Sequence, residues 1–228
     1  MNNFELGLKN PIWYALEEAH KKFSMTYDGV KFYDPEICPF GAFKDASKTA
    51  SALNEYAKLV DSFFLVSENE DPTFDEDFMV LDQKFECIQM VINTLKSCEI
   101  TETIVPLTEK HRDAVYDLVW LTMPGYYKKR TLDMGGYFGI FKEGNLVSIA
   151  GQRIQTNHFI EISAVVTHPD YTRQGLAKQL VVHTTQEIFK TGKKAILHVT
   201  KGNPAIKLYE KLGYELTRDM NWWYFHKK

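Results

Sequence analysis

One segment of the 228-residue sequence has the residue types and spacing of a phosphate-binding loop. Thr172-Arg173-Gln174-Gly175-Leu176-Ala177 follows an apolar strand and a proline turn, and it opens a helix. Such a segment leaves consecutive backbone N–H groups unpaired at the positive end of the helix dipole, where anions bind. Gly175 allows a phosphate to approach the backbone closely. The alternative interpretation is an ordinary strand-to-helix turn with an incidental glycine.

A second candidate is Tyr209, on the apolar face of a helix predicted over residues 204–212. Asn203 is a favourable N-cap residue, Pro204 suits the first helical position, and Gly213 suits the end. The hydroxyl of Tyr209 can act as a catalytic acid. It can equally belong to a core tyrosine whose hydroxyl finds a partner, and the sequence alone leaves both interpretations open.

A third candidate is Glu161, a carboxylate inside the otherwise apolar strand predicted over residues 159–167. Alternation along the strand places Glu161 on the same face as Ser163 and Val165. A carboxylate whose pKa is raised by burial can act as a general base, directly or through water. The alternative is a glutamate that makes a structural hydrogen bond.

The elements that must position these groups fall into two parts that divide near residue 100. Hydrophobic alternation and turn residues favour an α/β segment over residues 1–100 and a more regular α/β unit over residues 101–228. In the first part we expect helices starting at Pro11 and over 48–60, with strands over 30–33, 61–66 and 85–91. In the second part we expect helices from 108, over 175–190 and over 204–212, with strands over 103–107, 137–142, 146–151, 159–167, 195–200 and 222–225.

Composition excludes several classes of protein. Hydrophobic residues make up 44% and charged residues 25%, as in soluble globular proteins, and the net charge of −3 argues against a nucleic-acid partner. The three cysteines Cys38, Cys87 and Cys98 have no metal-ligand spacing, so no metal is expected. The first residues do not resemble a signal peptide, and no apolar run is long enough to span a membrane. We therefore expect a cytoplasmic protein that does not bind membranes.

Taken together, the loop and the Tyr209 helix resemble the GNAT superfamily of acetyl-CoA-dependent N-acyltransferases, over roughly residues 101–228. The family's loop pattern is [QR]xxGx[GA]; the sequence keeps Gly175 and Ala177, with Thr172 at the first place. The second pattern is NxxAxxLYxxxGF. Its matches here are Ala205, Leu208, Tyr209, Gly213 and Tyr214, whereas Gly202 stands at the Asn place and Asn203 lies one residue later.

The resemblance implies a fold and a set of cofactor contacts. The fold would be a mixed, mostly antiparallel central sheet flanked by helices, of the α/β (α+β) class. The strand end at Val165, Val166 and Thr167 would lie beside the pantetheine arm of acetyl-CoA. The backbone of the loop would hold the pyrophosphate, and the family patterns place the further cofactor contacts as follows: Arg173, Gln174, Gly175, Leu176, Ala177, Lys178, Asn203 and Ala205.

The resemblance also implies an activity, which is acetyl transfer from acetyl-CoA to a primary amine by direct attack in a ternary complex. Tyr209 would protonate the departing thiolate, and Glu161 would act as general base. The acceptor would be a small-molecule or peptide amine. Two alternatives are transfer of another acyl group by the same machinery, and a CoA-binding regulatory module without turnover.

Residues 1–100 contain no motif of comparable strength. They resemble an extension found ahead of this domain in some bacterial GNAT proteins, and a degenerate GNAT-like half is one architecture they could form. Their many aromatic residues should pack beside the acceptor mouth, together with the loop over 123–136, which contains Tyr126, Tyr127 and Arg130. The alternative is a segment that serves only stability and the contacts of a homodimer.

Overall fold

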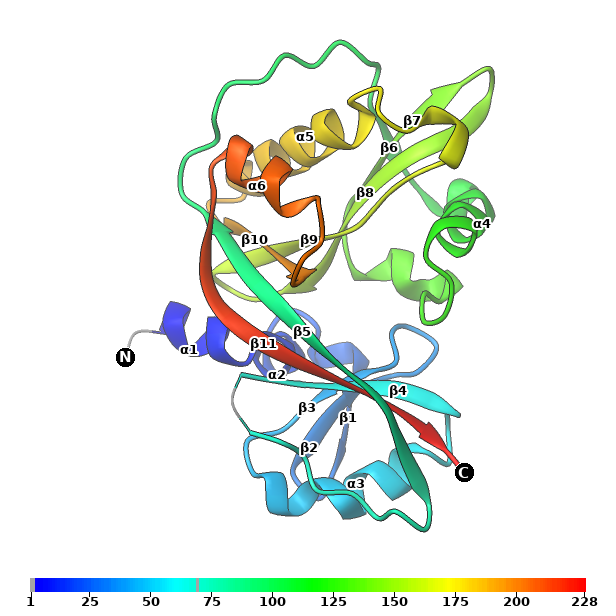
Figure 1. Cartoon of the computed structure of the whole chain (residues 1–228), viewed down its shortest axis with the longest axis vertical. Coiled ribbons are helices and arrows are strands. Elements are labelled where there is room, and N and C mark those ends of the chain that lie inside the picture. The colour runs from blue at the N-terminus through cyan, green and yellow to red at the C-terminus, as the bar shows by residue number, and fades with distance from the viewer. Residues whose placement is uncertain (1–2, 69) are drawn as a thin grey trace.

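The computed structural model describes residues 3–68 and 70–228, and their strands form one mixed sheet (Figure 1). The strands pair antiparallel except for two parallel pairs, β3 with β4 and β10 with β9. The expected α/β class with a mostly antiparallel sheet is confirmed. The order across the sheet is β1 (Ser24–Tyr27), β2 (Val30–Tyr33), β3 (Phe40–Ala42), β4 (Ser62–Ser67), β11 (Tyr214–Lys227), β5 (Met79–Ile92), β10 (Lys194–Thr200), β9 (Phe159–Thr167), β8 (Asn145–Gln155), β7 (Tyr137–Lys142) and β6 (Val105–Leu107).

Helices flank this sheet at both of its ends. In Figure 1, α5 and α6 lie over the upper part of the sheet, and α3 lies at the opposite end. The helices are α1 (Asn3–Lys9), α2 (Pro11–Glu17), α3 (Thr49–Tyr56), α4 (Arg112–Thr122), α5 (Leu176–Lys190) and α6 (Ile206–Leu212). Short 3-10 turns cover Lys21–Phe23, Ala46–Lys48, Glu109–His111, Lys129–Met134 and Pro169–Tyr171.

The two longest strands join the two parts of the chain. Strand β5 precedes residue 100 but lies between β10 and β11, and β11 ends the chain but lies between β4 and β5. Trp222 of β11 pairs with Val66 on one side and with Phe85 on the other. The sheet is thus continuous across residue 100, and the division into 1–100 and 101–228 stays a prediction.

Strand β9 is irregular where it passes the middle of the sheet. Ala164 has a φ of 50°, a left-handed conformation that is uncommon for a residue with a side chain, and the pairing of β8 with β9 shifts register nearby. The parallel pairing of β9 with β10 runs from Phe159 only as far as Glu161, opposite Ile196. Beyond this point the two strands separate.

Helix α6 begins two residues later than the sequence predicts. Asn203 accepts a hydrogen bond through Oδ1 from the backbone N–H of Ala205 at 2.8 Å, which forms a tight turn around Pro204. The first helical residue is therefore Ile206. Gly213 ends the helix with a φ of 105°, as expected for a glycine cap.

The described residues contain neither a membrane-spanning helix nor a metal-binding cluster. No helix among them is long and apolar enough to cross a membrane. No group of three or more His, Cys, Asp or Glu side chains within 3–68 and 70–228 is placed to hold a metal ion.

Candidate active site

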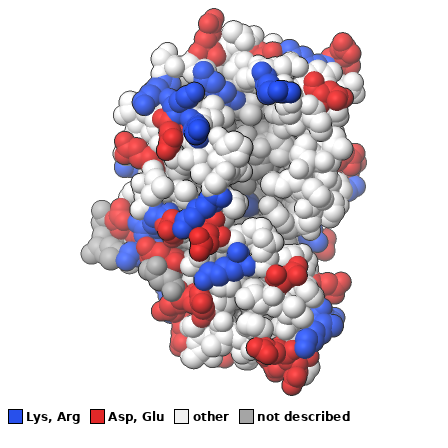
Figure 2. Space-filling view, in the orientation of Figure 1, with Lys and Arg blue, Asp and Glu red and all other residues white. Residues whose placement is uncertain are grey.

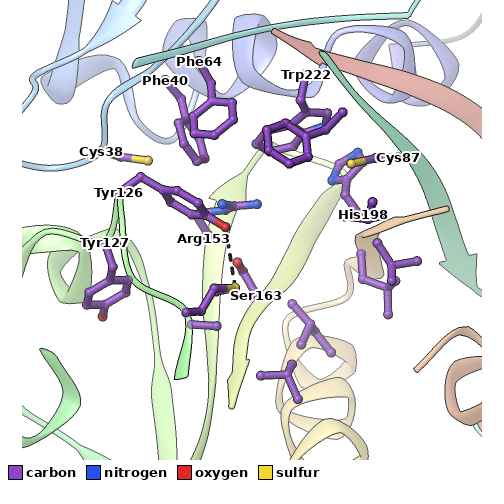
Figure 3. A pocket seen from close by; sticks show the side chains of 18 of the residues that line it. Cys38, Phe40, Phe64, Cys87, Tyr126, Tyr127, Arg153, Ser163, His198 and Trp222 are labelled. Carbon is purple, nitrogen blue, oxygen red and sulfur yellow. Dashed lines mark hydrogen bonds between the residues drawn. The ribbon is translucent and has the colours of Figure 1, made fainter. Parts of the chain in front are cut away.

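A cavity of about 250 Å³ opens where β9 and β10 separate (Figure 3). Residues 162–165 of β9 line one side, and residues 197–200 of β10 line the other. Figure 2 shows this face hollowed near its middle, and the surface around the hollow is largely uncharged. The unpaired strand edges therefore form the sides of a cleft that a ligand can enter.

The first hundred residues contribute a wall of this cavity, as expected from their aromatic content. Aromatic rings of β3, β4 and β5 face the cavity together with two thiols; these residues are Cys38, Phe40, Phe64, Phe85 and Cys87. The loop over 123–136 adds Met123, Tyr126, Tyr127 and Thr131. Arg130 of that loop does not line the cavity, because its guanidinium lies near Asp34 and Asp133.

Tyr209 of α6 lines the cavity on the side of β10. Its side chain is mostly buried, and burial raises the pKa of its hydroxyl to about 12. The hydroxyl forms no hydrogen bond with any residue of 3–68 or 70–228, unlike that of Tyr214, which pairs with Thr185 at 2.7 Å. The hydroxyl of Tyr209 therefore has no protein partner and belongs to a residue that lines the cavity, where it can serve a ligand.

Two residues of the predicted phosphate loop have a left-handed backbone conformation. Gly175 is the N-cap of α5 with a φ of 78°, and Arg173 also has a positive φ, of 61°. Within the described chain, the backbone N–H groups of residues 173–178 donate to no acceptor. A Cβ placed on Gly175 would have no atom within 4 Å, so the space in front of the loop is open. The donors of six consecutive residues are thus available to a phosphate.

The other predicted cofactor residues differ in their placement. Val165 and Asn203 line the cavity. Val166 is buried in the core, while the Thr167 hydroxyl lies 2.7 Å from that of Ser148. Ala205, like the loop itself, does not line the cavity. These residues lie along β9 and just before the starts of α5 and α6.

Glu161 does not have the raised pKa expected of a general base. Burial alone would raise its pKa, but the Arg153 guanidinium and the His198 ring together lower it to about 2. Nε and Nη2 of Arg153 each donate to a Glu161 oxygen at 2.8 Å, and Nδ1 of His198 lies 2.7 Å from Oε1. Glu161 is buried as expected, but the expected rise of its pKa is wrong, because β8 and β10 supply partners that the alternation pattern cannot show.

His198 of β10 has a hydrogen-bond partner at each ring nitrogen. The side-chain amide of Gln89 donates to the carbonyl of Leu8 at 2.9 Å, which fixes its NH₂ group on the side of His198. Nε2 of His198 lies 3.0 Å from that NH₂ and must accept, so its proton is on Nδ1 and faces Glu161. Both ring nitrogens are occupied, as expected for a satisfied core histidine.

Arg153 is the site residue that sequence analysis missed. It lies on β8 beside the register shift between Gln152 and Gln155, so no regular cross-strand spacing connects it to Glu161. Its guanidinium lies 4.8 Å from the ring centroid of Phe40 and 5.2 Å from that of Trp222. These partners come from sequence positions 40, 161 and 222, and no local pattern brings them together.

Comparison with known proteins agrees with this architecture. Residues 137–223 match the family model of FR47-like proteins. Over 54 residues, 24% of the chain, the sequence is 39% identical to the mouse protein named Cysteine-rich protein 2-binding protein, and equally to the human one. The chain spans about 7% of the length of those two proteins, so the likeness is confined to a short segment.

Solved structures match the chain over nearly its full length. A structure from Novosphingobium aromaticivorans, described as belonging to the GNAT family of acetyltransferases, is 25% identical, with a TM-score of 0.84 over 97% of this chain and 98% of that one. A GCN5-related N-acetyltransferase-like protein from Streptococcus suis shares the fold at 16% identity and a TM-score of 0.62, over 95% and 93% of the two chains. A GCN5-related N-acetyltransferase from Kribbella flavida shares it at 15% identity and a TM-score of 0.59, over 100% and 96%.

The resemblance inferred from the Gly175 loop and the Tyr209 helix is therefore confirmed. The match to the FR47-like model includes both motifs, and the whole-chain structural match includes the first hundred residues as well. The chain is thus similar in fold to the GNAT acetyltransferases, and similar in sequence to FR47-like proteins over residues 137–223.

Proposed function

We propose that this protein transfers an acetyl group from acetyl-CoA to a primary amine by direct attack in a ternary complex. The observation that carries the proposal is the Tyr209 hydroxyl, which has no partner among the described residues and lies at a cavity formed by the separation of β9 and β10. A hydroxyl so placed can protonate a departing thiolate.

The residues present fit the phosphate-bearing end of acetyl-CoA. Acetyl-CoA, when bound, supplies an activated acetyl group on a thiol whose reference pKa of about 8.5 makes it a tolerable leaving group. Residues 173–178 offer unpaired N–H groups at the start of α5, with open space at Gly175. Between this loop and the cavity runs β9, whose residues 162–165 present an unpaired strand edge. The backbone can thus orient an extended thioester along β9.

The chemistry of the cavity favours direct transfer over an acyl-enzyme intermediate. The two thiols that line the cavity are both held in the protonated form, since burial raises the pKa of Cys38 to about 12 and that of Cys87 to about 11. The thiolate, not the thiol, is the nucleophile in cysteine catalysis. An incoming amine is then the nucleophile that attacks the thioester.

Under this proposal, Glu161 positions Arg153 and His198 and does not act as the general base. Its carboxylate does not line the cavity, and it holds Arg153 and His198 in place through three short contacts. The lining residues, all of which lie in the described chain, include no carboxylate. The amine therefore loses its proton to water in the cleft, or enters already neutral.

A thiol-release assay tests this proposal. Purified protein is mixed with acetyl-CoA and a panel of primary amines, and free CoA and acetylated amine are both quantified. The expected result is amine-dependent CoA release in equal amounts with acetylated product. Tight binding of acetyl-CoA without release for any amine would favour the regulatory-module alternative. Faster release from a longer acyl-CoA would favour a different acyl donor.

A further inference from the structure

One side of the Arg153 guanidinium is left without a partner. Its Nε and Nη2 atoms donate to Glu161, but Nη1 forms no hydrogen bond with any residue that the structure describes. The side chain keeps 12% of its surface exposed, and Arg153 lines the cavity. Figure 3 shows the guanidinium at the centre of the cavity, above Ser163 and beside Tyr126. The free Nη1 donors are thus available to a ligand there.

The guanidinium is fixed in this position by its surroundings. Bidentate pairing with Glu161 sets the plane of the group, and the rings of Phe40 and Trp222 pack against it at 4.8 and 5.2 Å. Burial acts to lower the pKa of Arg153, but the Glu161 carboxylate raises the pKa by more than burial lowers it. The guanidinium therefore stays charged. A preorganised donor loses little conformational entropy when a ligand binds.

The chemistry of the remaining lining restricts what such a donor can bind. Arg153 is the one Arg, Lys, Asp or Glu among the lining residues of the described chain. The lining around it is aromatic and comes from both parts of the chain, including Phe40, Phe64, Tyr126 and Trp222. A guanidinium in an apolar setting favours an anionic oxygen ligand over a neutral one. The volume of about 250 Å³ favours a small molecule.

We infer that the acceptor is a small amine that carries a carboxylate on an apolar body, as amino acids with apolar side chains do. The Nη1 donors of Arg153 bind the carboxylate, and the aromatic wall packs on the apolar part. This inference rests on the proposed function, because it names the acceptor class for that reaction. It also explains how an amine is held in a cavity whose lining contains no carboxylate.

A binding comparison tests the inference without depending on turnover. N-acetylphenylalanine and N-acetylleucine are compared by calorimetry with N-acetylphenethylamine and N-acetylisoamylamine, which lack only the carboxylate, in the presence of CoA. Because a hydrogen bond to a charged group is worth more than a neutral one, the carboxylated member of at least one pair should bind tenfold or more tightly. Equal or weaker binding of the carboxylated member in both pairs overturns the inference.

Variants of Arg153 test whether its guanidinium causes the preference for carboxylated ligands. Arg153→Lys keeps a charge beside Glu161 but removes the Nη1 donors, so carboxylate binding should fall about tenfold while binding of the uncarboxylated partner changes little. The matched control is Arg218→Lys, because Arg218 is equally buried but pairs with Glu5 and Glu68 and does not line the cavity. The double variant Arg153→Met/Glu161→Gln removes the buried ion pair as a unit and guards against unfolding from an unpaired charge. Retained carboxylate preference in a folded form of both Arg153 variants contradicts the assignment.

The acetylation assay and the binding comparison together separate the failure of this inference from the failure of the proposed function. If amines are acetylated but phenethylamine is used as well as phenylalanine, the function stands and the acceptor class is wrong. If acetyl-CoA binds and no amine is acetylated, the proposed function fails, and the binding comparison still decides whether Arg153 holds a carboxylate.

Discussion

At the scale of a single residue, the Tyr209 hydroxyl separates a catalytic role from a packing role. Tyr209→Phe keeps the ring and removes an oxygen that has no hydrogen-bond partner in the described chain, so the variant should be about as stable as the parent. If the hydroxyl protonates the thiolate, kcat should fall roughly 100-fold or more, with the KM for acetyl-CoA little changed. Steady-state kinetics and thermal unfolding measure both effects.

Tyr214→Phe is the matched control for this experiment. The ring of Tyr214 lies 6.1 Å from that of Tyr209, but its hydroxyl is buried against Thr185 and does not line the cavity. Removing it should cost about 1 kcal/mol of stability and leave kcat nearly unchanged. If the kcat of Tyr209→Phe is close to that of the parent, Tyr209 has only a packing role.

The residues of the site differ in how far the sequence reveals them. Tyr209 and Gly175 belong to local motifs in which spacing along the chain fixes their place on a helix. Glu161 lies in a buried strand as predicted, but its pKa is lowered where the sequence predicts a rise. The reason is that Arg153 and His198 reach Glu161 from β8 and β10, across a register shift that no alternation pattern contains. Charge partners across a sheet depend on the fold.

At the scale of elements, the start of α5 should bind the pyrophosphate of acetyl-CoA. Gly175→Glu places a side chain and a negative charge in the open space at the start of the helix, beside the unpaired N–H groups of residues 173–178. Affinity for acetyl-CoA should fall on the order of a hundredfold or more. Calorimetric titration of the folded variant measures the change.

Gly192→Glu provides the control, because it repeats the same backbone strain at the other end of α5. Gly192 has a φ of 76°, close to the 78° of Gly175, and a Cβ there also meets nothing within 4 Å. Both variants should lose similar stability from the strained conformation. An equal loss of acetyl-CoA affinity in the two variants would mean that strain, and not the phosphate site, explains the effect.

Elements with local signals were predicted well, and elements defined by pairing were not. The strand over 159–167 and the hairpin of β7 and β8 follow from alternation and a Gly turn. Strand β11 was expected only over 222–225, but it spans Tyr214–Lys227 because β5 pairs with it along nearly its whole length. The short strands β1 and β3 and helix α1 were not expected, since three to seven residues with little periodicity carry a weak signal.

At the scale of the whole molecule, the two parts of the chain meet around a buried histidine. His20 follows α2, and its Nδ1 lies 2.9 Å from the hydroxyl of Tyr33, in β2. Its Nε2 lies 3.0 Å from the carbonyl of Met134, which belongs to the second part of the chain. Because a carbonyl only accepts, Nε2 carries the proton and Nδ1 accepts from Tyr33. The neutral ring thus links the two parts.

This contact should make the stability of the protein depend on pH. Burial lowers the pKa of His20 to about 4, with smaller lowering by Lys22 and Lys193 and an opposing effect of the Met134 hydrogen bond. Between that value and the unfolded value of about 6.5, the unfolded chain binds the proton and the folded one does not, so stability falls as pH decreases through this window. The loss of unfolding free energy between about pH 7.5 and about pH 5 is roughly 2 kcal/mol.

Urea unfolding at these two pH values measures the effect. The parent should lose roughly 2 kcal/mol of unfolding free energy on going to the lower pH. In His20→Gln, whose amide can still donate and accept, the loss should be smaller by about that amount. His226→Gln, at a partly exposed histidine near Asp82, should keep the parent's loss. The same loss in His20→Gln as in the parent would show that other groups cause the pH dependence.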